Sequence, residues 1–231
     1  MSLLRLEQAA HGIVHLVMDD PAHAANVLDA AALADLDAAL AELAARSDVA
    51  GVLVRGGRSG TFATGAEVEA LGPVPDREAA VRAIERAQAT LARLADLSCP
   101  TVAAMDGPCL GVGAELALAC DSRLAADEPR TRIGLPDVVL GFCPALGATT
   151  RLVRLVGLRR ALELLLEGRL VGAREAERIG LVARAVPAAT LLDQAERRLA
   201  EAVARRARGS PPAGDRWRPR SIGEWLADGT A

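Results

Sequence analysis

Lysine and tyrosine are absent from the 231 residues, and phenylalanine and tryptophan occur only twice each. Without lysine the chain can form no lysine Schiff base with a carbonyl substrate and has no P-loop lysine for phosphates. The net charge is −3 and the sequence pI is about 5.7. The protein therefore lacks the overall positive field that attracts nucleic acids or anionic membranes, and we expect neither as a partner.

Cysteine is sparse and irregularly spaced. Cys99, Cys109, Cys120 and Cys143 stand in apolar surroundings with neither C-x-x-C nor histidine spacing, which argues against a zinc site and a disulfide framework. We expect four buried thiols in a reducing compartment. The acidic Glu7 interrupts any signal-peptide core, and no apolar run reaches the roughly 18 residues that span a bilayer. These features predict a soluble, cytoplasmic protein.

Hydrophobic residues make up 51% of the chain, enough for a substantial core, and their periodicity alternates between strand and helix patterns. A hairpin of two short strands is expected around the His11-Gly12 turn. Further strands are predicted at 49–55, 100–105, 122–126 and 182–185, and helices at 29–46, 76–97, 146–156, 158–167, 173–179 and 188–207. Residues 127–136 are expected to form a polar loop. Strands alternating with helices predict an α/β domain with a largely parallel sheet.

Two glycine-containing loops follow predicted strands, at 60–67 and at 107–115, and the second continues as an apolar helix. Small residues at such junctions let a ligand approach the backbone, and N–H groups at a helix start point the same way. Two neighbouring loops could form an oxyanion hole, although tight α/β connections also favour glycine. A dinucleotide site is disfavoured because the third glycine of that motif is missing and Glu115 stands where phosphates would lie.

Four segments, in order along residues 12–190, resemble the enoyl-CoA hydratase/isomerase (crotonase) superfamily. The first, around Asn26, is similar to its N-A-L element, and Phe62-Ala63-Thr64-Gly65-Ala66-Glu67 resembles its F-x-x-G-A-D/E loop. Residues 100–107 with 111–116 resemble the block P-x-I-A-A-x-x-G followed by G-G-G-x-E-L, and Asp121 continues this match. Residues 135–147 are similar to the P-E-x-x-x-G-x-x-P segment and the glycine after it.

The resemblance implies a core of repeated ββα units that binds acyl-CoA thioesters and assembles as a homotrimer or a dimer of trimers. It places a crotonase-like core at 1–190 and a shortened, atypical C-terminal helix and tail at 191–231. Position by position, the N–H groups of Ala66 and Val112 would form the oxyanion hole, with Glu115 and Asp137 as the catalytic carboxylates. Substrate contacts would fall on Phe62, Ala63, Gly65, Gly111, Phe142 and Cys143. No metal is implied, nor any cofactor beyond the CoA of the substrate.

Two acids favour hydration, because adding water to an enoyl thioester uses one group to activate water and one to deliver a proton. Double-bond isomerisation would need only one of them. Asp137 stands where hydratases usually have Glu, and Val112 replaces a glycine, so a weakly catalytic or non-catalytic relative acting as a partner subunit is the other alternative. The enzyme hypothesis comprises a hydratase, an isomerase or another enolate-forming relative.

The C-terminal end departs most from the family pattern. Arginine, glycine and proline are frequent at 205–220, and Trp217 and Trp225 lie in or after this stretch. We expect residues 215–227 to pack on the body or on a neighbouring subunit, because two indoles are rarely left exposed without a purpose. The arginines there could instead meet CoA phosphates, or the tail could simply be solvated. The three histidines lie near the N-terminal hairpin, away from the motifs, and are expected at surface or hydrogen-bonded positions.

Overall fold

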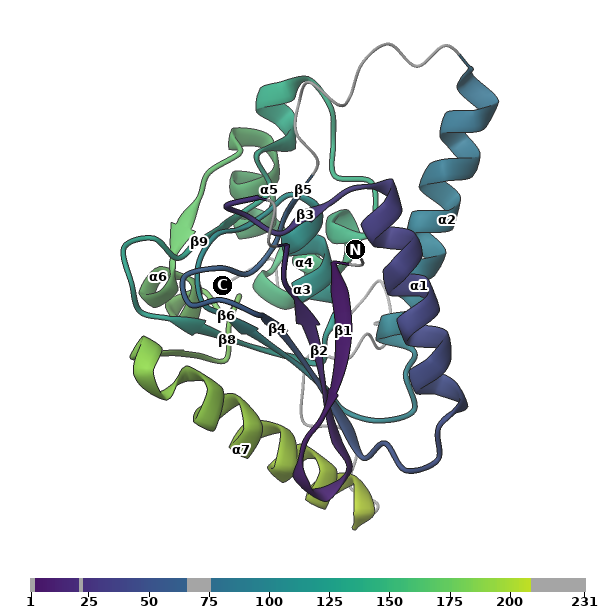
Figure 1. Cartoon of the computed structure of the whole chain (residues 1–231). Coiled ribbons are helices and arrows are strands. Elements are labelled where there is room, and N and C mark those ends of the chain that lie inside the picture. The colour runs from purple at the N-terminus through teal and green to yellow at the C-terminus, as the bar shows by residue number, and fades with distance from the viewer. Residues whose placement is uncertain (1–2, 21–22, 66–75, 209–231) are drawn as a thin grey trace.

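A computed structural model describes residues 3–20, 23–65 and 76–208 (Figure 1). Its centre is a six-stranded sheet in the order β1-β2-β4-β6-β8-β11. The strands of this sheet are β1 (Leu4–Gln8), β2 (Ile13–Met18), β4 (Gly51–Gly56), β6 (Thr101–Met105), β8 (Ser122–Ala126) and β11 (Arg184–Val186). Every neighbouring pair is parallel except the β1–β2 hairpin. The predicted hairpin and the parallel sheet are confirmed.

Short strands between the long ones form two smaller sheets. They are β3 (Val27–Leu28), β5 (Thr64–Gly65), β7 (Cys109–Leu110), β9 (Arg132–Gly134) and β10 (Val171–Gly172). β3 pairs with β5, and β7 and β10 flank β9. A long strand, a short strand and a helix therefore recur three times between β2 and the helix after β7, which is the expected ββα repeat. The prediction of a continuous loop at 127–136 was wrong at β9, since three residues are too few to show a strand periodicity.

Seven α-helices lie within the described residues. They are α1 (Ala30–Ala45), α2 (Arg77–Ala95), α3 (Val112–Ala119), α4 (Ala148–Val156), α5 (Leu158–Glu167), α6 (Ala173–Arg178) and α7 (Ala188–Ala207). Asp29 and Asp76 cap α1 and α2, because their side chains accept hydrogen bonds from the N–H groups of Ala32 and Glu78. The predicted helices are confirmed to within a few residues at their ends.

The strands place alternate side chains on two faces of the sheet. In β4, Val52 and Val54 belong to the large core under α1–α6, whereas Leu53 faces α7. Leu191, Ala195 and Leu199 follow each other at one-turn intervals and bury one stripe of α7 against that second face. Figure 1 shows α7 on one side of the sheet and α3 and α4 on the other. Residue 190, the expected boundary of the core, lies inside α7.

Residues 215–227, which include Trp217 and Trp225, lie outside the described residues, so their expected packing stays a prediction. Within the described ranges, no helix combines the length and the apolar character needed to cross a bilayer.

Candidate active site

The two glycine loops meet where β5 ends beside the start of α3. A Cβ atom on Gly65 would lie 3.3 Å from the Val112 nitrogen, so only glycine lets these backbones approach without displacement. The next residue, Gly113, has no room for a Cβ at all, because it packs directly against the Ala63 carbonyl. The first intrahelical bond of α3 runs from Glu115 N to Gly111 O at 3.0 Å, so the Val112 N–H precedes the helical ladder. Ala66, the other expected oxyanion donor, lies outside the described residues.

Glu115 is buried, with 1% of its surface exposed, and its carboxylate is held by main-chain donors at the start of α4. The Leu146 N–H lies 2.8 Å from Oε2 and 3.1 Å from Oε1, and the Ala148 N–H donates to Oε2 at 2.8 Å. Oε2 therefore receives both short bonds. Oε1 receives the longer branch from the Leu146 N–H.

Asp137 lies in the 3-10 helix η3 (Pro136–Leu140) and is 7% exposed. Its Oδ1 is 4.0 Å from the position that a Cβ on Gly111 would take, which places the carboxyl beside the start of α3. Its Oδ2 is buried and has no hydrogen-bond partner among the described residues. An unpartnered buried carboxyl oxygen costs stability, so its presence here is typical of a functional position.

Both carboxyls titrate above their ordinary range. Burial raises the pKa of Glu115, the N–H groups of Ala148 and Leu146 oppose that rise, and the charge of Asp137 adds to it. Burial likewise raises the pKa of Asp137. Because the charge of Asp137 acts on Glu115, the two acids form one electrostatically linked pair.

The expected substrate contacts separate into two groups. Phe62 and Ala63 are buried in the core just before β5, while Gly65 and Gly111 are partly exposed where the two loops meet. Phe142 and Cys143 lie in the exposed loop after η3, and Phe142 is 41% exposed. Cys99, Cys109 and Cys120 are buried as expected, but the prediction for Cys143 was wrong, because its loop lies over the surface.

Asn26 supports the first loop from below, and this role was not evident in the sequence. Its buried side-chain amide donates to Met18 O at 2.9 Å and to Phe62 O at 2.7 Å, and its Oδ1 accepts from Asp20 N at 2.9 Å. The Asn26 carbonyl also accepts from Thr64 N at 2.9 Å. One residue thus ties the end of β2 to the segment that enters β5.

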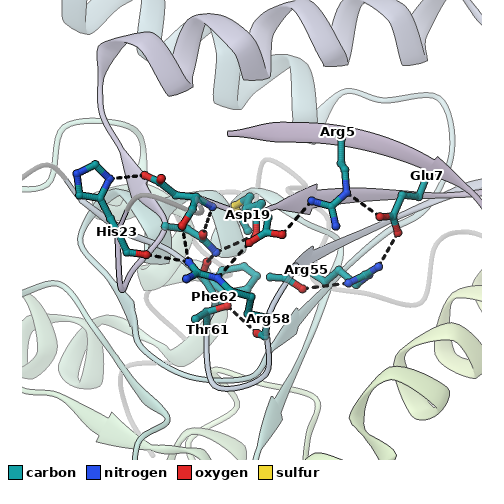
Figure 2. Close-up of polar contacts among 12 residues, drawn as sticks. Arg5, Glu7, Asp19, His23, Arg55, Arg58, Thr61 and Phe62 are labelled. Atoms are coloured by element: carbon teal, nitrogen blue, oxygen red, sulfur yellow. Dashed lines mark hydrogen bonds and ion pairs between the residues drawn. The ribbon is translucent and has the colours of Figure 1, made fainter. Parts of the chain in front are cut away.

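A second, partly exposed network of charged side chains lies next to this residue (Figure 2). Arg58 pairs with Asp19 at 3.0 Å and donates to the carbonyls of Asp20 and His23 at 2.7 and 3.0 Å. Arg5 lies 3.1 Å from the other oxygen of Asp19. The loop before Phe62 is therefore fixed by several charges contributed by the first strands of the sheet.

Two of the histidines are hydrogen-bonded and the third, His11, is exposed, in agreement with the sequence expectation. His15 is buried on β2 between Arg55 and Glu196, each 3.2 Å away. His23 pairs with Asp20 at 2.7 Å.

The fold and the arrangement around α3 define a crotonase-type protein. The model of the enoyl-CoA hydratase/isomerase family matches residues 8–210, and the chain belongs to this family. Among solved structures, an enoyl-CoA hydratase from Bacillus anthracis superposes with a TM-score of 0.80 at 31% identity, covering 88% of this chain and 77% of that one. DspI of Pseudomonas aeruginosa gives a TM-score of 0.82 at 28% identity, covering 99% and 93%.

Curated relatives share more identity but are much longer. The fatty acid oxidation complex subunit alpha of Vibrio cholerae is 41% identical over 187 residues, which is 80% of this chain and 26% of that protein. The same subunit of Shewanella amazonensis is 38% identical over 190 residues, 82% of this chain and 27% of the relative. The chain thus spans about a quarter of the length of these relatives.

Proposed function

We propose that the protein hydrates 2-enoyl-CoA thioesters. The observation that carries this proposal is the pair of buried carboxyls, Glu115 and Asp137, beside the partly exposed end of β5 and the first turn of α3. A thioester carbonyl placed at this turn would accept a hydrogen bond from the Val112 N–H, and the Ala66 N–H is the proposed second donor. Such donors stabilise the negative charge that develops on the oxygen when the conjugated double bond is attacked.

The hydrogen bonds divide the acid and base roles. Two main-chain N–H groups favour the ionised form of Glu115, which therefore takes a proton from water as the water oxygen bonds to C3. Asp137 has a buried oxygen without a described partner, which favours its protonated form, and it delivers a proton to C2. The double bond is consumed and one water is added. The proton now on Glu115 returns through solvent to the ionised Asp137, so the cycle closes without a metal or a cofactor beyond CoA.

Isomerisation is the second candidate. Moving a double bond from C3 to C2 needs one carboxylate that carries a proton between carbons, and Glu115 alone would suffice. Hydration is favoured over isomerisation because a second acid, Asp137 on η3, lies beside the first turn of α3, which also carries Glu115.

Incubation with 2-enoyl-CoA thioesters of several chain lengths tests the proposal through loss of the absorbance of the conjugated thioester. Incubation with 3-enoyl-CoA thioesters tests the second candidate through the gain of that absorbance. Loss of absorbance with 2-enoyl-CoA and no gain with 3-enoyl-CoA supports the hydratase. A gain with 3-enoyl-CoA and no loss with 2-enoyl-CoA supports the isomerase in its place. CoA-thioester binding with neither change would support a non-catalytic relative.

We further propose that the substrate is an intermediate of fatty acid oxidation and that the protein is a homo-oligomer, either a trimer or a dimer of trimers. The curated relatives, which are fatty acid oxidation complex subunits alpha, support the substrate class. Exposed apolar side chains support assembly, since Val139 on η3 is 73% exposed and Leu166 on α5 is 63% exposed. Sedimentation equilibrium of the full chain tests this, and a monomer at all concentrations would contradict it.

A further inference from the structure

Arg151 links the turn beside the candidate site to the C-terminal end of α2. It lies in the first turns of α4, and its Nη1 donates to Leu146 O at 2.9 Å while its Nη2 donates to Leu91 O in α2 at 3.4 Å. The guanidinium also lies against Gly147, where a Cβ would overlap Nη1. The side chain therefore links the turn at 145–148 to the last turns of α2.

This turn is the one that holds the proposed catalytic base. Leu146 accepts from Arg151 through its carbonyl and donates to Glu115 through its N–H. The next N–H donor to Glu115 belongs to Ala148, on the other side of Gly147. Fixing the Leu146 carbonyl thus orients the peptide groups on both sides of it, and with them both donors.

The charge of Arg151 acts in the same direction as its hydrogen bonds. Burial lowers the pKa of Arg151, and the negative charge of Glu115 opposes that lowering. The guanidinium and the carboxylate therefore interact electrostatically without touching. A cation at this position favours the ionised form of Glu115.

We propose that Arg151 is a positioning residue for the reaction: it holds the turn at 145–148 so that two N–H groups fix the Glu115 carboxylate in its reactive orientation. The inference rests on the proposed function only for its predicted effect on enoyl-CoA turnover. The positioning itself concerns groups described in this chain.

A cavity of about 330 Å³ makes the proposal testable by chemical rescue. It opens beside Arg151 between the ends of α2 and α3 and the start of α4, and Asp96, Thr150 and Arg154 also line it. A single water needs only about 10–15 Å³ of such space. A guanidinium ion can therefore enter the space that the truncated side chain leaves in Arg151→Ala.

The experiment compares Arg151→Ala, Arg151→Lys and the matched control Arg154→Ala, which truncates an arginine of the same helix and the same cavity. Turnover of a 2-enoyl-CoA by Arg151→Ala should fall about 10- to 100-fold in kcat with a smaller change in KM, since a displaced reactive group loses rate rather than binding. Low millimolar guanidinium chloride should restore part of kcat, and equal concentrations of sodium chloride or urea should not. Arg151→Lys should keep intermediate activity, and Arg154→Ala should stay within about twofold of the unchanged protein.

A second readout separates failure of this inference from failure of the proposed function. Carbon-13 NMR of labelled glutamate side chains, with Glu115→Gln to assign the signal, follows the titration of Glu115 without any substrate. In Arg151→Ala and Arg151→Lys the pKa of Glu115 should move upward, most in the alanine variant. If the unchanged protein turns over no enoyl-CoA yet these shifts occur, the function is wrong and the positioning stands. An unmoved titration in both variants overturns the inference, as does equal loss of kcat in Arg154→Ala.

Discussion

The acids of the candidate site and those on the first strands contain the same functional group in opposite environments. Glu115 and Asp137 are buried, and the described partners of Glu115 are main-chain N–H groups. Glu7 and Asp19 lie at the edge of the sheet among arginine side chains (Figure 2). Burial raises the pKa of Glu115, whereas the hydrogen bond from Arg5 lowers the pKa of Glu7.

The difference shows what each environment favours. An arginine partner stabilises the charged form, so Glu7 stays ionised and contributes only to holding the loop. A buried carboxyl without a cation in contact remains close to proton exchange, which is what acid–base catalysis needs. Proton transfer is therefore expected from Glu115 and Asp137 alone, and the variants below test this contrast.

Glu115→Gln should have the largest effect. The amide keeps the size of the side chain but cannot take a proton from water, so kcat on a 2-enoyl-CoA should fall at least about 100-fold. Thioester binding should change little, as measured by calorimetry with a saturated acyl-CoA. Turnover equal to that of the unchanged protein would remove Glu115 from the mechanism. Glu7→Gln is the matched control from the other pair and should retain full activity.

Asp137→Glu tests whether the length of this side chain limits proton delivery to the substrate. The longer side chain restores the residue common at this position in hydratases, and if the shorter carboxyl limits proton delivery, kcat should rise about 10-fold. Stopped-flow or steady-state measurement of enoyl-CoA loss decides this. A lower kcat would show that the turn around η3 is already fitted to aspartate.

The sequence predicted the helices, the parallel sheet and the two loops, because apolar periodicity and glycine placement are local signals. It could not identify what holds Glu115, since the donors are the backbone N–H groups of Leu146 and Ala148, more than 30 residues away, and any residue type supplies them. Arg151 was missed for a related reason, because the sequence does not distinguish a half-buried arginine that donates to main-chain carbonyls from a solvated one. The proposed pairing of Ala66 with Val112 stays a prediction.

Asp137→Asn should stabilise the fold while it abolishes proton delivery. Burial raises the pKa of Asp137, so the ionised carboxyl destabilises the folded state above that pKa. At pH 7 the variant should gain roughly 1–2 kcal/mol, a typical size for relieving a functional strain. The gain should shrink as the pH falls through the folded pKa and vanish below about 3.9, where both states are protonated. Urea unfolding at pH 7 and pH 4 measures this, and equal stability at pH 7 would contradict it.

His15 should make the junction between the sheet and α7 sensitive to acid. Burial and the charge of Arg55 lower its pKa, while Glu196 and Glu7 oppose the shift. Because the folded pKa lies below the unfolded value of about 6.5, the stabilising contribution is complete above that pH and is lost as the pH falls through the folded pKa. Protonation removes the acceptor for Arg55 Nε, a loss of about 1 kcal/mol. His15→Gln should therefore show a weaker fall in unfolding free energy from pH 7 to pH 5 than the unchanged protein.

The smallest effect is expected from Glu7→Gln. Glu7 lies 2.8 Å from Arg5 and 2.6 Å from Arg55, yet its side chain is 38% exposed, and water and salt screen both pairs. Exposed ion pairs contribute about 0–1 kcal/mol, so the unfolding free energy should fall by no more than this at low salt and by less in 1 M sodium chloride. Glu7 also keeps its charge to lower pH than an unpaired glutamate, because hydrogen bonding to Arg5 lowers its pKa. Its contribution should then persist at pH 5 and disappear only in stronger acid. A loss well above 1 kcal/mol, or one that salt does not reduce, would contradict this. It would mean that Glu7 is needed to hold Arg5 and Arg55 in place.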